Sequence, residues 1–140
     1  MPANRLVNVL IFMDEVNEFN GPLMLVPGSH RGKAIKNDVD DSTTSYPIRA
    51  LNNLDVANAI EVNGMVAPKG PAGSVIFANT NIIHGSASNM SPWDRLIVYV
   101  SYNRTDNAIR RFKRPAYVAH RDFTPLSVLP EDCLIFRSML

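Results

Sequence analysis

A histidine and an arginine stand close together in the stretch NTNIIHGSASNMSPWDRLIVYV, residues 79–100. His84 ends one apolar, strand-like run, and Arg95 opens another. A neutral imidazole is a good ligand for a transition metal, and the guanidinium of arginine binds a carboxylate through paired hydrogen bonds. These two residue types predict a site that holds a metal ion beside a carboxylate. On chemistry alone, the commoner alternatives are a structural histidine and a surface arginine.

The run before His84 predicts a strand over residues 74–83, in which alternate side chains share one face. That face narrows from bulky to small and polar side chains, in the order Ile76, Ala78, Thr80, Ile82 and His84. Small side chains leave room beside a reactive group, so Ala78 and Thr80 are candidates for the wall of a substrate pocket. Asn8, which interrupts an apolar run, is a third candidate. A structural hydrogen bond to Asn8 is an equal alternative.

Arg95 lies at the start of a second predicted strand, residues 96–102. If residues 85–94 form the loop of an antiparallel pair, His84 and Arg95 come close together across it. Iron-bound 2-oxoglutarate needs both kinds of group, because its keto-acid end chelates the metal and its far carboxylate needs a buried cation. Spacing alone does not decide between this hypothesis and the alternative of a structural histidine and a surface arginine.

The remaining chain predicts a β-rich domain. The other expected elements are strands over 5–13 and 23–27, a polar surface excursion over 31–47, and a helix over 53–62. Asn52 or Asn53 can cap the helix, and Gly64 can end it. Several strands and one short helix indicate an all-β sandwich or barrel. We expect a single domain over residues 1–140, with a polar tail over 104–140.

Composition describes an ordinary globular protein. Among its 140 residues, 14 are Lys or Arg and 13 are acidic, so no strong field draws the chain to nucleic acid or an anionic membrane. Cys133 is the only cysteine, which excludes an internal disulfide framework and fits a reducing compartment. With neither a secretion signal nor a membrane span in the pattern, we expect a cytoplasmic protein that acts on a small molecule.

Two segments, EFNGPLMLVPGSHR (18–31) and GPAGSVIFANTNIIHGSASNMSPWDR (70–95), resemble the phytanoyl-CoA dioxygenase family. The likeness covers roughly residues 5–125 and is strong to ectoine hydroxylase and related small-molecule hydroxylases. It implies an iron(II)- and 2-oxoglutarate-dependent dioxygenase on a double-stranded β-helix, a jelly-roll or cupin-like barrel. Such an enzyme couples oxidative decarboxylation of 2-oxoglutarate to hydroxylation of a substrate. The substrate implied is a small polar metabolite, ectoine-like or amino-acid-like.

The resemblance also implies roles for individual residues. His84 matches the family's distal iron-binding histidine. Ser86 matches a hydroxyl that helps to bind 2-oxoglutarate, and Arg95 matches the arginine that pairs with its far carboxylate. Pro27, Gly28 and Ser29 match a turn, and His30 is expected to be structural.

The two other iron ligands of the family come from a His-x-Asp or His-x-Glu motif, which the resemblance places before the first strand. Here that position holds only MPANR, residues 1–5. We therefore expect the C-terminal portion of a family member, with an incomplete barrel whose exposed strand edges favour self-association. Alone, it should be inactive and should not bind Fe(II) stoichiometrically. The literal motif His120-Arg121-Asp122 in the tail is a less favoured substitute.

Two alternatives remain open for the chain's function. It could be a metal-free jelly-roll binding or interaction module descended from the enzyme. It could also belong to a heteromeric enzyme in which another chain supplies the missing ligands. His84 and Arg95 are shared by all of these hypotheses and do not separate them.

Overall fold

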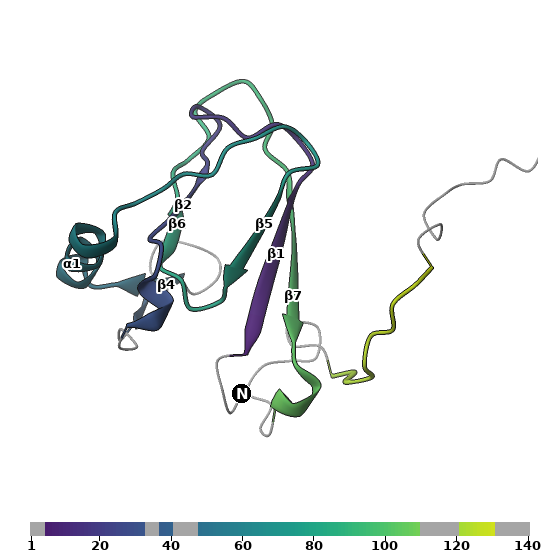
Figure 1. Ribbon diagram of the computed structural model, residues 1–140. Helices are drawn as coiled ribbons and strands as arrows, with labels where there is room; N and C mark the ends of the chain where they lie inside the picture. The colour runs from purple at the N-terminus through teal and green to yellow at the C-terminus, as the bar shows by residue number, and fades with distance from the viewer. Residues whose placement is uncertain (1–4, 33–36, 41–47, 110–120, 131–140) are drawn as a thin grey trace, which may run out of the picture. The chain divides into compact units, whose positions relative to one another are not determined.

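The computed structural model describes residues 5–32, 37–40, 48–109 and 121–130, and these form a β-rich fold with one α-helix (Figure 1). The chain divides into two compact units, Asn4–Asn103 and Arg104–Leu140, the latter with Met1–Ala3. All described strands and the α-helix lie in the first unit. The single domain expected over residues 1–140 stays a prediction.

Strand β1 (Leu6–Phe12) is the centre of a three-stranded antiparallel sheet. It pairs with β5 (Val75–Asn79) on one side and with β7 (Ile97–Asn103) on the other. A nearly continuous apolar run predicts a strand, and the strand expected over residues 5–13 is confirmed.

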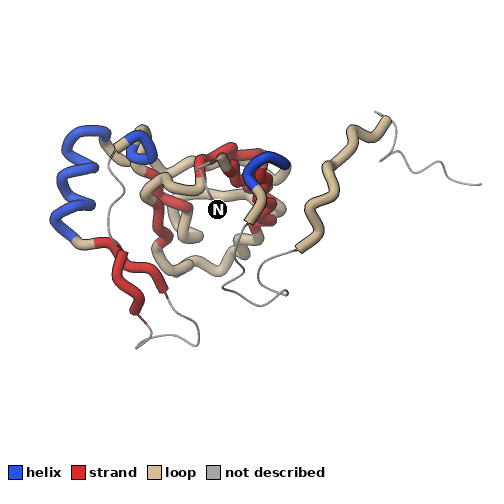
Figure 2. The backbone as a smooth tube through the Cα atoms, turned by 90° about the horizontal axis from the view of Figure 1, so that it is seen from below, coloured by secondary structure: helices blue, strands red, loops and turns tan. Residues whose placement is uncertain are grey.

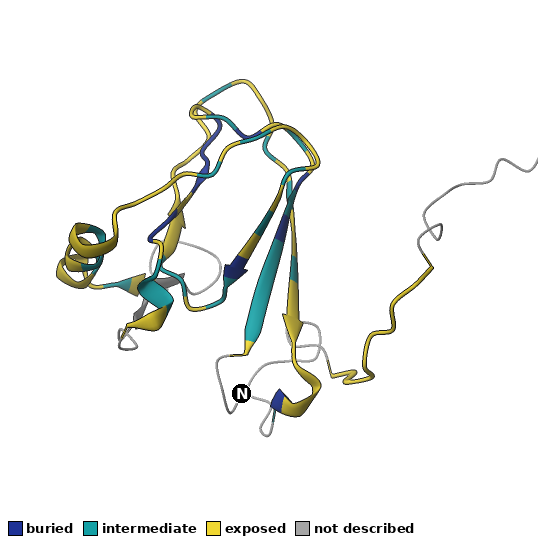
Figure 3. Cartoon of the chain, viewed as in Figure 1, coloured by how far each residue is buried: buried dark blue, intermediate teal, exposed yellow. Residues whose placement is uncertain are grey.

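A second, two-stranded sheet faces the first and encloses the core. It pairs β2 (Leu23–Leu25) with β6 (His84–Ser86). The core cluster joins the two sheets through Leu10 of β1, Ala78 of β5, and Leu23 and Leu25 of β2. Figure 3 shows these buried positions along β1 and β2 and at the end of β5.

The opposite face of the three-stranded sheet is apolar and largely open. Phe77 lies opposite Val9, and Val9 lies opposite Val100, so the three side chains share this face. Phe77 is 73% exposed and Val98, on the same face, is 40% exposed. In the described part of the chain the strands therefore close no barrel, as expected for an incomplete jelly roll.

The single strand expected over residues 74–83 is wrong, because β5 ends at Asn79. The Asn79 carbonyl accepts a hydrogen bond from the Ile82 amide (3.1 Å), and its side-chain oxygen accepts one from the Asn81 amide (2.9 Å). An asparagine side chain that bonds its own backbone two residues on favours a turn over a strand. His84 therefore lies on a separate strand from Ala78.

The polar excursion contains a hairpin that the sequence pattern did not indicate. Strand β3 (Asn37–Asp40) pairs with β4 (Ile48–Leu51), while residues 33–36 and 41–47 lie outside the described residues. The sequence NDVD is rich in Asp and Asn, which are depleted in strands, so it gave no strand signal. Figure 2 shows the hairpin and the helix together at one end of the unit.

The helix prediction is confirmed. Helix α1 runs over Asn53–Asn63, and the Asn52 side chain caps it by accepting a hydrogen bond from the Leu54 amide (2.8 Å). Gly64 ends it with φ of 68°, a left-handed conformation that glycine adopts without strain. No helix in the described ranges is long and apolar enough to cross a membrane.

The second unit is described over residues 104–109 and 121–130. A short 3-10 helix, η2, spans Thr105–Asn107. Arg104 binds Asp106 through two hydrogen bonds, of 3.0 and 2.9 Å, which accounts for the order of this exposed turn. Residues 121–130 are extended and exposed.

Candidate functional site

The backbone carbonyl of Ile82, two residues earlier, orients the ring of His84. Its Nδ1 lies 2.9 Å from the Ile82 carbonyl oxygen. Because a carbonyl oxygen can only accept, Nδ1 carries the hydrogen, and in the neutral ring Nε2 then has the lone pair. Histidine ligands of metals commonly have this arrangement, in which one ring nitrogen is held by a carbonyl and the other is available. The exposed imidazole of His84 is thus suited to bind a metal through Nε2.

The segment before His84 is held by the Pro27-Gly28-Ser29 turn. The Ser29 hydroxyl oxygen accepts a hydrogen bond from the Ile83 amide (2.9 Å), and the Val26 amide donates one to the Ile83 carbonyl (3.0 Å). Gly28 makes the turn possible, since its φ of 78° is left-handed. Sequence reasoning assigned Ser29 to the turn but missed that its hydroxyl fixes the backbone beside His84.

His84 and Ser86 share one face of β6, because they are two residues apart on a strand. They lie opposite Leu25 and Leu23, whose side chains are in the core. Directly opposed residues of an antiparallel pair point to the same side, so His84 and Ser86 are on the inner face of this sheet. Ser86 is exposed there, with its hydroxyl on the side that carries the imidazole.

Arg95 carries a buried hydrogen-bond donor without a partner. Its Nε is buried and makes no hydrogen bond. Leaving such a donor unpaired costs about 1–3 kcal/mol, so its presence calls for a reason. A carboxylate oxygen is the natural acceptor for a guanidinium N–H. Arg95 therefore fits the far carboxylate of a dicarboxylate such as 2-oxoglutarate.

The hairpin expected between His84 and Arg95 is not formed. Strand β6 pairs with β2, whereas β7, which starts two residues after Arg95, pairs with β1. The two residues thus stand at the ends of strands in different sheets. Residues 85–94 connect the two sheets instead of turning within one.

The three weaker pocket candidates occupy different surroundings. Asn8 and Ala78 are opposed across β1 and β5, and Ala78 belongs to the core. The Ser101 hydroxyl donates a 2.7 Å hydrogen bond to the Asn8 side-chain oxygen, so the structural partner foreseen for Asn8 is present. Thr80 is half-buried in the turn after β5. Their part in a substrate pocket stays a prediction.

The described residues do not form a three-ligand metal site. Among them, no group of three or more His, Cys, Asp or Glu side chains is placed to hold a metal. His120 lies outside the described residues. Asp122 is exposed, and its carboxylate accepts a hydrogen bond from the Thr124 amide (2.8 Å). A facial triad needs three ligands, so these residues alone do not complete one.

The family described as phytanoyl-CoA dioxygenase (PhyH) matches residues 1–97, a range that includes His84, Ser86 and Arg95. An ectoine dioxygenase from Stutzerimonas stutzeri is 34% identical over 146 residues, covering 96% of this chain and 48% of the relative. An L-proline trans-4-hydroxylase from Streptomyces griseoviridis is 30% identical over 142 residues, covering 94% and 52%. The chain spans about half the length of the curated relatives that it matches.

Two solved structures share the fold. EctD from S. alaskensis with 2-oxoglutarate and 5-hydroxyectoine matches with a TM-score of 0.71 and 29% identity, over 86% of this chain and 40% of that one. EctD with bound Fe matches with a TM-score of 0.72 and 28% identity, over 89% and 42%. The predicted jelly-roll fold and the predicted family are confirmed. This chain belongs to the phytanoyl-CoA dioxygenase family of iron- and 2-oxoglutarate-dependent oxygenases.

Proposed function

We propose that the chain forms the distal half of the active site of an iron(II)- and 2-oxoglutarate-dependent hydroxylase of a small polar metabolite. The unpartnered, buried Nε–H of Arg95 carries the proposal, because it is a donor set aside for a carboxylate. Relatives named ectoine dioxygenase and L-proline trans-4-hydroxylase support a small, polar, amino-acid-like substrate.

Each residue has a distinct part in this proposal. Arg95 binds the far carboxylate of 2-oxoglutarate, and the Ser86 hydroxyl donates a further hydrogen bond to the same molecule. His84 offers its Nε2 lone pair to iron while the Ile82 carbonyl holds its Nδ1 hydrogen. When bound, iron and 2-oxoglutarate would activate dioxygen, so that one oxygen atom enters the hydroxylated substrate, the other enters succinate, and carbon dioxide is released. The chain's own task is to orient the two groups next to each other.

The other two iron ligands, we propose, are neither among the described residues nor His120 of the tail, and are supplied by a further part of the polypeptide or by another chain. Two observations support this view. The described residues hold no metal-binding group of three side chains, and the curated relatives are about twice as long as the alignment. One histidine competes poorly with water for Fe(II).

Anaerobic titration of the purified 140-residue chain with Fe(II), followed by a succinate assay, tests this proposal. We expect no stoichiometric binding and no succinate from 2-oxoglutarate with ectoine or L-proline present. Stoichiometric iron binding that disappears in His120→Ala would show instead that the tail motif completes the triad.

The second candidate is a metal-free binding module, which would also hold no three-ligand group among the described residues, whereas the named relatives are enzymes. The coding DNA before the Met1 codon separates the two. An in-frame His-x-Asp or His-x-Glu motif supports the hydroxylase. An in-frame stop codon followed by a start signal supports the binding module, unless metal binding appears on adding a partner chain.

A further inference from the structure

The backbone on both sides of Arg95 is held by side chains from one loop, residues 13–22, which joins β1 to β2. The Asp14 carboxylate accepts a hydrogen bond from the Leu96 amide (2.7 Å), just after Arg95. The Asn20 side-chain amide donates one to the Asp94 carbonyl (3.3 Å), just before it. In addition, the Met13 amide donates to the Leu96 carbonyl (2.9 Å). Arg95 is thus fixed between two anchored neighbours.

Asn20 is suited to this task because it is fully buried and uses both ends of its amide. It is 0% exposed. Its oxygen accepts a hydrogen bond from the Asn17 amide (2.9 Å), and its nitrogen also donates to the Glu15 carbonyl (2.8 Å). An aspartate at position 20 could accept but not donate, so the two carbonyls would lose their donor.

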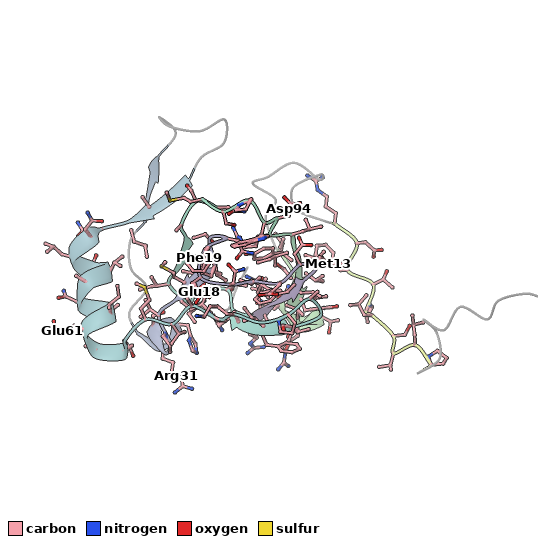
Figure 4. All side chains as sticks on the ribbon, turned by 90° about the horizontal axis from the view of Figure 1, so that it is seen from above. Met13, Glu18, Phe19, Arg31, Glu61 and Asp94 are labelled. Atoms are coloured by element: carbon pink, nitrogen blue, oxygen red, sulfur yellow. The ribbon has the colours of Figure 1, made fainter. Side chains whose placement is uncertain are left out.

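The loop can reach the segment before Arg95 because a glycine follows Asn20. Gly21 has φ of 73°, and a Cβ there would lie 2.6 Å from the Ala87 carbonyl oxygen. Phe19 and Trp93 make a further contact, with ring centroids 6.3 Å apart. In Figure 4 the labelled residues Met13, Glu18, Phe19 and Asp94 lie apart from Glu61 on α1. The close packing explains how short side chains span the two segments.

We infer that Asp14 and Asn20 are positioning residues for Arg95. They hold residues 94–96 so that the buried Nε–H of Arg95 meets a carboxylate without rearranging. Because this donor has no protein partner, its direction has to come from the backbone and from packing. This inference rests on the proposed function, in which Arg95 binds the far carboxylate of the co-substrate.

The Arg95 Nε–Hε signal in proton–nitrogen correlation spectra of the full chain is the readout, first without ligand and then during titration with glutarate. Glutarate has the two carboxylates of 2-oxoglutarate and needs no metal. Arg95→Lys assigns the signal. The variants are Asp14→Ala, Asp14→Asn and Asn20→Asp, and Glu15→Ala is the matched control. Glu15→Ala removes the same charge from the same loop. The Glu15 side chain is exposed, whereas those of Asp14 and Asn20 hold Leu96 and Asp94.

We expect Asp14→Ala and Asn20→Asp to broaden or shift the ligand-free Arg95 signal and to weaken glutarate binding about tenfold, the effect of losing one good hydrogen bond. Asp14→Asn should keep wild-type behaviour, because its amide oxygen can accept the same Leu96 N–H. That rescue distinguishes positioning by a hydrogen bond from a general effect of charge. Glu15→Ala should resemble the wild type in both readouts.

Wild-type signals and wild-type glutarate affinity in a folded Asp14→Ala variant would overturn the inference. So would equal losses in Asp14→Ala and Glu15→Ala. If Asn20→Asp does not fold, the comparison of Asp14→Ala with Asp14→Asn decides alone. If the wild type binds no glutarate, the proposed role of Arg95 is wrong, and the ligand-free signal still judges whether Asp14 and Asn20 position it.

Discussion

In its proposed role, Arg95 shows at the scale of one residue how a group that binds a ligand lowers the stability of the free protein. A buried guanidinium N–H without an acceptor is unfavourable in the free protein and becomes favourable only when a carboxylate arrives. The same logic applies to His84, whose ring is oriented by the Ile82 carbonyl and whose other nitrogen is proposed to bind iron. In the proposed function, both side chains are held in position before the carboxylate and the metal bind.

Replacing Arg95 by methionine should therefore stabilise the ligand-free chain, by about 1 kcal/mol, because a buried unpaired donor disappears while apolar contacts remain. Urea denaturation of wild type and Arg95→Met measures the difference. Arg31→Met is the control, since Arg31 is exposed and should change stability by less than about 0.5 kcal/mol. A loss of more than about 1 kcal/mol in Arg95→Met would mean that the guanidinium is structural.

Glu18, in the loop of residues 13–22, gives a prediction about the pH dependence of stability. A backbone hydrogen bond, and then the charge of Lys69 at 3.6 Å, lower the pKa of Glu18. A lowered folded pKa means that this small stabilisation is present above the unfolded pKa and is lost as the pH falls through the folded one. Lys69→Gln should move the pKa of Glu18 only part of the way back, because the backbone bond, the larger cause, remains. Carboxyl NMR titration measures this, and a complete return would contradict it.

At the scale of elements, tight turns bring distant segments together. The loop at residues 13–22 and the Pro27-Gly28-Ser29 turn hold the backbone next to Arg95 and His84. In Figure 1 the loops that follow β1 and that lead into β5 and β7 gather at one end of the unit. The loops therefore position the candidate site residues as much as the strands do.

Three glycine-to-alanine variants separate strain from close contact. Gly21→Ala should destabilise the chain by about 2–4 kcal/mol, since it adds a left-handed alanine and a clash with the Ala87 carbonyl. Gly64→Ala has the left-handed φ but open space, and about 1 kcal/mol is expected. Gly85→Ala has neither problem and should be nearly neutral. Thermal or urea unfolding measures the loss of stability in each variant. Equal losses in Gly21→Ala and Gly64→Ala would contradict a contribution from the clash.

Sequence reasoning succeeded where the determinant was local. β1, β7 and α1 follow from apolar runs and from an asparagine cap with a terminal glycine. It failed where a single side chain or a partner distant in the sequence determined the end or the pairing of a strand. The Asn79 side chain ends β5, and β6 finds its partner in β2, about sixty residues earlier. The roles of Asp14 and Asn20 depend on contacts with residues 82 and 74 positions away in the sequence, which no local pattern reveals.

At the scale of the whole molecule, the open face of the β5-β1-β7 sheet is an exposed apolar surface with regular structure. Phe77, Val75 and Val98 lie on it and are 73%, 45% and 40% exposed. The sheet also has free edges at β5 and β7 among the described strands. Open apolar faces and unpaired edges favour association. We propose that the isolated chain self-associates through this sheet.

Phe77→Lys should therefore lower the apparent mass measured by light scattering at increasing protein concentration, with little loss of stability because the side chain is mostly exposed. Met90→Lys is the matched control, since Met90 is 92% exposed but lies in a loop. A monomeric wild type, or an equal effect of the two variants, would contradict association through the sheet face.

Titration of the metal-free 140-residue chain with 2-oxoglutarate, compared with Arg95→Lys, tests the central claim most directly. The account predicts saturable one-site binding to the wild type, at least about tenfold weaker in Arg95→Lys, because lysine cannot reproduce the guanidinium fork. No binding to the wild type, or the same affinity in both proteins, would contradict it.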